Sequence, residues 1–238
     1  MFLVGRQHLR QDISTDTEEH ISQTSTSTFK NITMKKNKFL YILVCINLLL
    51  FSSCSPEDEI KNPDFNPLVF SEDFSVGAVD NAVLNIEGWS NIAEVGTAKW
   101  KTQIFSRNPY AEFSSFQSGD IVNIGWLVSP KINMDAYKGE TLQFQSAQSF
   151  VTSSANSLQV LIATDYIGTN LTTANWQTVN ANLPTASSPY FEFIKSGEID
   201  LSAYTGTINI AFKVKGSGTN NALDGSYQVD SVTIYTKQ

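Results

Sequence analysis

The chain has 238 residues, of which 41% are hydrophobic and 16% charged, and its formal net charge is −7. That length is enough for one or two domains with a sizeable core. The low charged fraction, together with 15 Phe, 4 Trp and 8 Tyr, argues against a disordered or coiled-coil chain. The acidic balance argues against nucleic acid as a partner, because binding phosphates requires a basic stripe.

The His and Cys residues lie near the start of the chain. Both histidines, His8 and His20, fall in the first 20 residues, and Cys45 and Cys54 lie within or beside one apolar run. The chain beyond Cys54 therefore has neither residue type. This excludes from it Ser-His-Asp and Cys-His nucleophiles, His-based metal sites, zinc ribbons and internal disulfides. We predict that the protein is not an enzyme.

The first segments resemble targeting sequence. Residues 1–33 are polar and rich in Ser and Thr, whereas a basic stretch at 34–38 leads into an apolar run over 39–51. As a helix this run would span about 20 Å, too short for a hydrocarbon layer of about 30 Å. We therefore predict a signal peptide over residues 34–53. Residues 1–33 are then either a non-native extension before a true start at Met34 or a disordered one.

The apolar run ends in the sequence FSSC at 51–54, with small residues before a cysteine. This resembles the lipobox of bacterial lipoproteins. The resemblance implies that Cys54 is acylated and that the protein is bound to a membrane through this N-terminal lipid anchor. The alternative is an ordinary secretory peptide with an accidental cysteine.

An acidic run, SPEDE at 55–59, follows the cysteine. It resembles the surface-export signal of Bacteroidetes lipoproteins, which implies a protein of the outer membrane exposed at the cell surface. The alternative is a plain acidic and polar linker over 54–67. From residue 54 onward the chain has 10 basic and 19 acidic residues, a net charge of −9, so its surface favours cations over anionic partners.

The remaining sequence has short runs of β-branched and aromatic residues separated by Gly, Pro, Asn and Ser. Alternation is clear where Leu142 and Phe144 share one side and Gln143 and Gln145 the other. The runs predict nine strands, at 69–74, 99–105, 110–116, 124–129, 141–150, 157–163, 190–196, 207–214 and 227–235. We expect an all-β fold, an antiparallel β-sandwich of the jelly-roll type, as a single domain over 68–238.

Seven segments in this region carry a resemblance to a known family. They are FSEDF at 70–74, GW at 88–89, WLVSP at 126–130, ATDY at 163–166, IDLS at 199–202, IAFK at 210–213 and YQVDSV at 227–232. In this order they resemble the choice-of-anchor J family, the cleaved-adhesin or MAM-like jelly rolls of Bacteroidetes surface proteins. The resemblance implies a non-catalytic jelly roll with a structural calcium between the first and last strands. Its ligands would be Asp73 and Asp230, with Glu72 as a third, since calcium binds carboxylate oxygens. The alternative is that these carboxylates are solvated or hydrogen-bonded at a strand end.

Glycan is one candidate ligand, because sugar sites combine aromatic faces with polar hydrogen-bonding groups. Four aromatic residues outside the family motifs are candidates for ligand contact, although each could instead be a core or edge residue. They are Trp100, Trp176, Tyr110 and Tyr190.

We therefore predict a lipid-anchored binding module that contacts glycan or another extracellular macromolecule. One alternative is a structural accessory subunit of a surface adhesion or polysaccharide-uptake assembly. A weaker alternative is a carboxylate-based glycoside hydrolase, suggested by EIDLS at 198–202. This segment resembles the EIDxE strand of laminarinase-like enzymes, but Ser202 stands where the second glutamate is needed.

Overall fold

A computed structural model describes residues 66–168 and 170–237. These residues belong to one of the two units into which the chain divides, Lys61–Gln238. The predicted extension at 1–33, the signal peptide at 34–53, the lipidated Cys54 and nearly all of the linker lie outside the described residues. Within the described part of the chain, no helix is long and apolar enough to cross a membrane.

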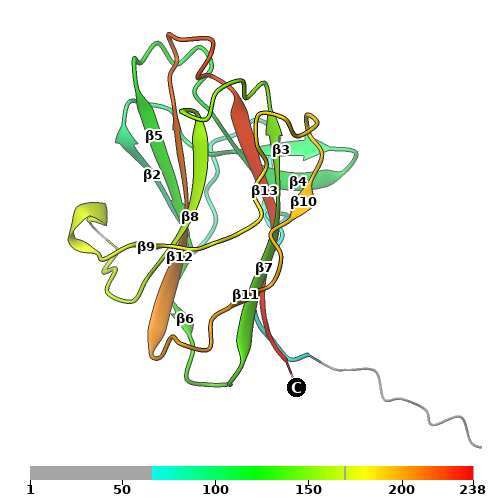
Figure 1. Cartoon of the computed structure of the whole chain (residues 1–238), viewed down its shortest axis with the longest axis vertical. Helices are drawn as coiled ribbons and strands as arrows, with labels where there is room; N and C mark the ends of the chain where they lie inside the picture. The colour runs from blue at the N-terminus through cyan, green and yellow to red at the C-terminus, as the bar shows by residue number, and fades with distance from the viewer. Residues whose placement is uncertain (1–65, 169, 238) are drawn as a thin grey trace, which may run out of the picture. The chain divides into compact units, whose positions relative to one another are not determined.

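The described residues form two antiparallel sheets that face each other, as predicted (Figure 1). The first, which we call sheet A, has the order β10 (Ile194–Lys195), β7 (Glu140–Ser149), β13 (Ser226–Thr236), β4 (Asn108–Ser114) and β3 (Lys101–Phe105). In addition β1 (Leu68–Glu72) pairs with β13, and β11 (Ile199–Asp200) pairs with β7.

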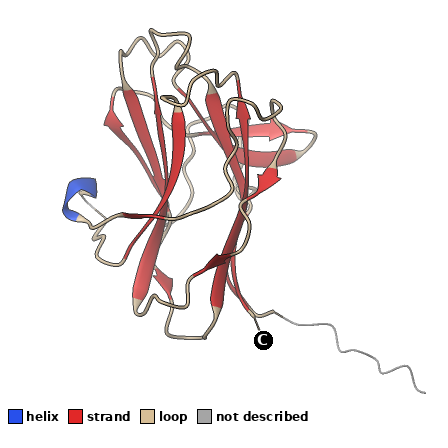
Figure 2. Ribbon diagram, in the orientation of Figure 1, coloured by secondary structure: helices blue, strands red, loops and turns tan. Residues whose placement is uncertain are grey.

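The second sheet, sheet B, has the order β2 (Ser90–Val95), β5 (Asn123–Val128), β12 (Thr207–Gly216), β8 (Ser157–Ala163) and β9 (Gln177–Thr178). The short strand β6 (Ile132–Asn133) also pairs with β12. Apart from one short helical turn, η1 (Leu171–Thr173), the described residues are strand and loop (Figure 2). The predicted all-β sandwich is confirmed.

One predicted strand is shorter in the structure, and one strand of the structure was not predicted. The run at 190–196 pairs as a strand only over Ile194–Lys195, and Tyr190 makes an isolated bridge to Gln148. Strand β2 was not predicted, because it lies at the edge of sheet B and its sequence SNIAEV has few apolar residues to signal it. Edge strands need less apolar surface than central ones, so their alternation is weak.

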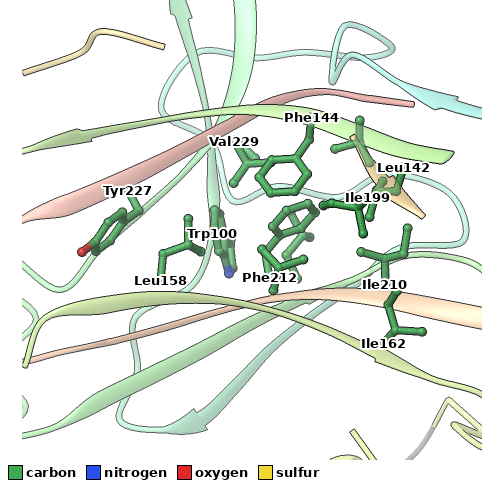
Figure 3. Packing of buried hydrophobic residues seen from close by; sticks show 14 of the residues in the cluster. Trp100, Leu142, Phe144, Leu158, Ile162, Ile199, Ile210, Phe212, Tyr227 and Val229 are labelled. Atoms are coloured by element: carbon green, nitrogen blue, oxygen red, sulfur yellow. The ribbon is translucent and has the colours of Figure 1, made fainter. Parts of the chain in front are cut away.

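The core lies between the sheets and follows the predicted alternation. Leu142 and Phe144 of β7 are fully buried, whereas Gln143 and Gln145 are partly exposed. Phe144 from sheet A meets Phe212 from sheet B edge-on, with ring centroids 5.2 Å apart, and Figure 3 shows the two side chains pointing toward each other. Burying each such side chain contributes about 1.5–3 kcal/mol, so these contacts hold the two layers together.

A second group of apolar residues, the outer cluster, covers the other face of sheet B. Trp126 of β5 packs against Trp176 at 5.3 Å between ring centroids, and Tyr166 packs against Trp176 at the same distance. The segment after β8, which includes η1, brings Tyr166, Leu171 and Trp176 onto this face. Trp126 and Val128 of β5 belong to this outer cluster, whereas Leu127 between them belongs to the core. Both faces of β5 are therefore buried, which explains why its sequence is a continuous apolar run.

Candidate ligand-binding site

Sheet A carries a polar patch on the face that points away from the core. Phe113 of β4 and Tyr227 of β13 belong to the core and pair in register. Because side chains alternate along a strand, their neighbours point outward. Glu112 pairs with Gln228, and Ser226 pairs with both Ser114 and Ser149. Register thus brings polar residues from β4, β13 and β7 together.

These residues are joined by hydrogen bonds. The Gln228 amide donates to Glu112 Oε2 at 2.7 Å and to Ser226 Oγ at 2.7 Å. Ser226 Oγ also lies 2.6 Å from Ser149 Oγ and donates to Glu112 Oε2 at 3.3 Å. The Glu112 carboxylate sets the orientation of the Gln228 amide, because a flipped amide would turn its oxygen toward a negative charge. The network fixes Glu112 and leaves its Oε1 without a hydrogen bond from the described residues.

Above this patch lies a pocket of about 600 Å³, the aromatic pocket. That volume is within the range of small-molecule sites. Its walls include four aromatic side chains that remain about half exposed: Phe116 59%, Phe150 59%, Tyr190 48% and Phe191 51%. The other lining residues are Glu112, Ser114, Ser149, Thr152, Asn221, Asp224 and Ser226.

The aromatic walls come from loops held close to the end of β7. Gln148 is fully buried, and its side-chain amide donates to the Ser188 carbonyl at 2.5 Å while its side-chain oxygen accepts from the Val151 amide at 3.1 Å. Its backbone carbonyl accepts from the Phe191 amide at 2.8 Å. One residue therefore positions both the turn that carries Phe150 and the segment that carries Tyr190 and Phe191.

Two wall residues have unusual backbone angles. Phe150 has φ 59° and Phe191 has φ 60°, in the left-handed region that costs a non-glycine residue about 1–3 kcal/mol. Their rings nevertheless remain half exposed. Burial of the rings does not offset this strain, and strain of this kind clusters at functional sites, so it favours a role of both residues in ligand contact.

A second cavity of about 470 Å³, the adjoining pocket, shares Phe191 with the aromatic pocket. It lies beside the turn between β3 and β4, and its other lining residues are Phe105, Ser106, Asn108, Tyr110 and Phe193. Tyr110 meets Phe193 edge-on at 5.5 Å between centroids, and burial raises the pKa of its phenol, with smaller contributions from Glu112 and Asp80. The two pockets therefore adjoin at Phe191.

The four aromatic residues predicted to contact a ligand divide into two groups. Tyr190 lines the aromatic pocket, and Tyr110 lines the adjoining pocket although only 8% of it is exposed. Trp100 is completely buried in the core (Figure 3) and packs against Phe113, so its prediction as a ligand contact is wrong. Trp100 immediately precedes β3, and its side chain points between the sheets. At the start of a strand the sequence does not show whether a side chain points into the core or toward solvent.

Trp176 belongs to the outer cluster, on sheet B. Its indole N–H donates to the Leu171 carbonyl at 3.0 Å, and its ring contacts Trp126 and Tyr166. These contacts give it a packing role that holds the η1 segment against the sheet. Contact with a ligand stays a prediction for this residue.

The three carboxylates predicted to bind calcium each accept hydrogen bonds from the protein. Glu72 accepts from the Phe74 amide at 2.7 Å and from the Trp89 indole at 3.1 Å. Asp73 accepts from Ser75, whose hydroxyl and amide lower the pKa of its exposed carboxyl. Asp230 accepts from Asn108 at 3.0 Å and from the Ser231 amide. No group of three or more acidic, His or Cys side chains that could hold a metal ion occurs in residues 66–168 and 170–237. Calcium at these three carboxylates stays a prediction.

Several residues of the aromatic pocket were missed by the sequence analysis, above all Glu112, Asp224, Phe116 and Phe150. Phe116 lies two residues after the end of β4 and Phe150 directly after the end of β7, so each is the last residue of a predicted strand, 110–116 or 141–150. The available signal was a Ser–Phe step at each strand end. This Ser–Phe step indicates a site only when β4 and β7 are known to lie close together in the sheet.

Comparison with known proteins shows distant structural likeness only. No protein-family model and no curated protein matches this sequence. Among solved structures, the K1 cleaved adhesin domain of Lys-gingipain from Porphyromonas gingivalis W83 is 18% identical with a TM-score of 0.44, covering 71% of this chain and 98% of that one.

Two carbohydrate-binding modules are similar to the same extent. TmCBM61, solved in complex with beta-1,4-galactotriose, is 13% identical with a TM-score of 0.43, covering 69% of this chain and 94% of that one. The CBM22-1 xylan-binding domain of Paenibacillus barcinonensis Xyn10C is 13% identical with a TM-score of 0.40, covering 74% of this chain and 99% of that one. Scores this low support no conclusion about the ligand of this chain.

Proposed function

We propose that this domain is a non-catalytic binding module that contacts glycan through the aromatic pocket. The observation that supports the proposal most directly is the combination of four half-exposed aromatic rings with a fixed polar patch. A sugar ring has an apolar C–H face that packs on an aromatic ring and hydroxyl groups that need hydrogen-bond partners. Glu112, Ser114, Thr152 and Asn221 are not buried and offer such partners beside the rings.

A glycan array with the full chain tests this function. We expect retention of at least one class of oligosaccharide, and a loss of affinity of at least tenfold in Tyr190→Ala and Phe150→Ala. Tyr137→Ala is the matched control, because Tyr137 is 46% exposed and precedes β7 at the end of that strand remote from the pocket. Silence of the wild-type protein on the array, or an equal loss in Tyr137→Ala, would overturn the proposal.

The same experiment addresses catalysis. Glu112 and Asp224 both line the aromatic pocket, and glycoside hydrolysis uses two carboxylates. We expect the retained oligosaccharide to be recovered unchanged after prolonged incubation. Release of new reducing ends, lost in Glu112→Gln, would instead make this pocket a hydrolase site.

We also propose that the module is tethered at the outer membrane through a lipid on Cys54 and exposed at the cell surface. The basic stretch, short apolar run and following cysteine support this proposal. Incorporation of labelled palmitate should be lost in Cys54→Ala, and protease added to intact cells should release the domain. Unchanged labelling, or full protection from protease, would contradict the anchor or the exposure respectively.

A structural calcium bound by Glu72, Asp73 and Asp230 is a separate proposal. The ion would have to replace N–H donors that these carboxylates now accept from. If it binds, calcium should raise the melting temperature of the full chain and EDTA should reverse the effect. Identical melting in calcium and in EDTA would remove the site.

A further inference from the structure

The charged residues that line the aromatic pocket are all acidic. Glu112 and Asp224 line it, and neither Lys nor Arg is among the lining residues of this pocket or of the adjoining pocket. Among the described residues, the ion pairs join Lys213 to Glu94 and Lys237 to Glu198. Both pairs lie outside the two pockets, so the pocket carboxylates have no counter-ion there.

Glu112 is held without a cation although one is near in the sheet. Lys101 of β3 is its direct partner in register, but the Lys101 ammonium donates to Asn81 Oδ1 at 3.2 Å. The bonds that Glu112 does accept come from neutral groups and reach Oε2 alone. Glu112 and Asp224 are both half-buried. A half-buried carboxylate without a counter-ion is stabilised by any positive charge that enters beside it.

The aromatic walls favour the same kind of ligand. The faces of Phe and Tyr rings carry a negative quadrupole potential that attracts ammonium groups. Phe150 lies between Tyr190 and Phe191, with ring centroids 4.9 Å and 6.3 Å away and interplanar angles of 50° and 82°. Rings in contact with one another at these angles form a single wall, so a ligand packs beside them and does not insert between parallel planes.

We infer that the aromatic pocket selects a glycan that carries a free, protonated amine, such as an oligomer of glucosamine. The inference rests on the proposed glycan function and specifies its ligand class. Two carboxylates and the aromatic wall bind the ammonium group, while Ser114, Thr152 and Asn221 bind hydroxyl groups that a simple cation lacks. The adjoining pocket, which shares Phe191, accepts the next part of the chain. Uronate and sulfate groups are repelled by the same carboxylates.

Calorimetry of the full chain with four tetrasaccharides tests the inference: β-1,4-linked glucosamine, the same oligomer with every amine N-acetylated, cellotetraose, and tetragalacturonate. At pH 6 and low salt we expect the amine form to bind at least tenfold more tightly than the acetylated or neutral form, and the galacturonate not to bind. The preference should shrink with added salt and at high pH, where the amine loses its charge.

Variants connect the preference to the pocket. Asp224→Asn should reduce the preference for the amine form over its acetylated form to less than threefold. Glu112→Gln should do the same, and its melting temperature shows whether the loss of its network has unfolded it. If Glu112→Gln is unfolded, the result for Asp224→Asn tests the inference alone, because the Asp224 side chain makes no hydrogen bond among the described residues. Glu87→Gln, which removes an exposed carboxylate outside the pocket, is the control and should keep the full preference.

Three outcomes would overturn the inference. Equal affinity for the amine, acetylated and neutral tetrasaccharides would do so while leaving glycan binding intact. A tetralysine peptide that binds as tightly as the glucosamine oligomer would show selection for charge without sugar. If both Asp224→Asn and a folded Glu112→Gln keep the preference for the amine, that preference does not come from the carboxylates of the aromatic pocket. Failure of every glycan on the array is the separate result that removes the proposed function itself.

Discussion

The backbone carbonyl of Gln148 accepts the amide N–H of Phe191 at 2.8 Å, so strand β7 directly holds the residue whose ring is shared by the two pockets. The Gln148 side chain adds bonds to Ser188 and Val151. A fully buried amide at the end of one strand thereby ties together two loops that are far apart in the sequence.

Replacing Gln148 should therefore affect both stability and binding. Gln148→Ala leaves the Val151 amide and the Ser188 carbonyl without partners, which we expect to cost about 1–3 kcal/mol in the free energy of unfolding. Glycan affinity should fall as well, because the aromatic walls lose their support. Urea denaturation and titration with the retained glycan measure the two effects. Gln145→Ala, on the same strand, is the control, and an equal result for both variants would contradict this role.

Close contact between the sheets depends on Gly125 of β5. A Cβ added there would overlap the ring of Phe113. We expect Gly125→Ala to lower the free energy of unfolding by about 1–3 kcal/mol, the usual cost of overpacking a core. In the double variant with Phe113→Leu the added methyl has more room, so the two losses should be less than additive. Strict additivity in denaturation curves would show that the two residues do not press on each other.

Tyr227 makes stability sensitive to alkaline pH. It is 3% exposed and donates to the Asn156 carbonyl at 2.9 Å. Burial raises its pKa from 10.0 to about 12. Below pH 10 the phenol is neutral in both the folded and the unfolded state. Above that value the unfolded state loses the proton first, so stability declines as pH rises toward 12, by about 2–3 kcal/mol in total.

Unfolding measured at pH 9 and at pH 11.5 tests this dependence. Tyr227→Phe should be less stable than the wild type at pH 9, by about 1 kcal/mol for the lost hydrogen bond. Its stability should then decline less than that of the wild type between the two values. Tyr137→Phe, at an exposed position, should behave like the wild type. A parallel decline in Tyr227→Phe and the wild type would rule out this residue as the source.

The packing role of Trp176 can be separated from ligand contact. Trp176→Ala removes ring contacts with Trp126 and Tyr166 and the bond to Leu171, so we expect a loss of about 2 kcal/mol in stability. Glycan affinity should stay within twofold of the wild type, because the aromatic pocket lies on sheet A. A selective loss of binding with unchanged stability would return Trp176 to the ligand site.

The sequence by itself determined the fold class, and it excluded His- and Cys-based chemistry from the chain beyond Cys54. Alternating residues such as Leu142 and Gln143 specify which side of a strand is buried, and this information is local. It also identified Tyr190 as an aromatic candidate. It did not separate Trp100 from Tyr190, because both lie near expected strand starts and their directions depend on what packs above them.

Only the tertiary structure decided where the pocket lies. Glu112 and Ser226 are 114 residues apart, and Ser149 and Ser226 are 77 apart, yet pairing of β13 with both β4 and β7 places them side by side. Which non-consecutive strands pair, and in what register, depends on how the whole core packs. The left-handed angles of Phe150 and Phe191 have the same origin, since surrounding contacts impose a conformation that these residue types do not favour alone.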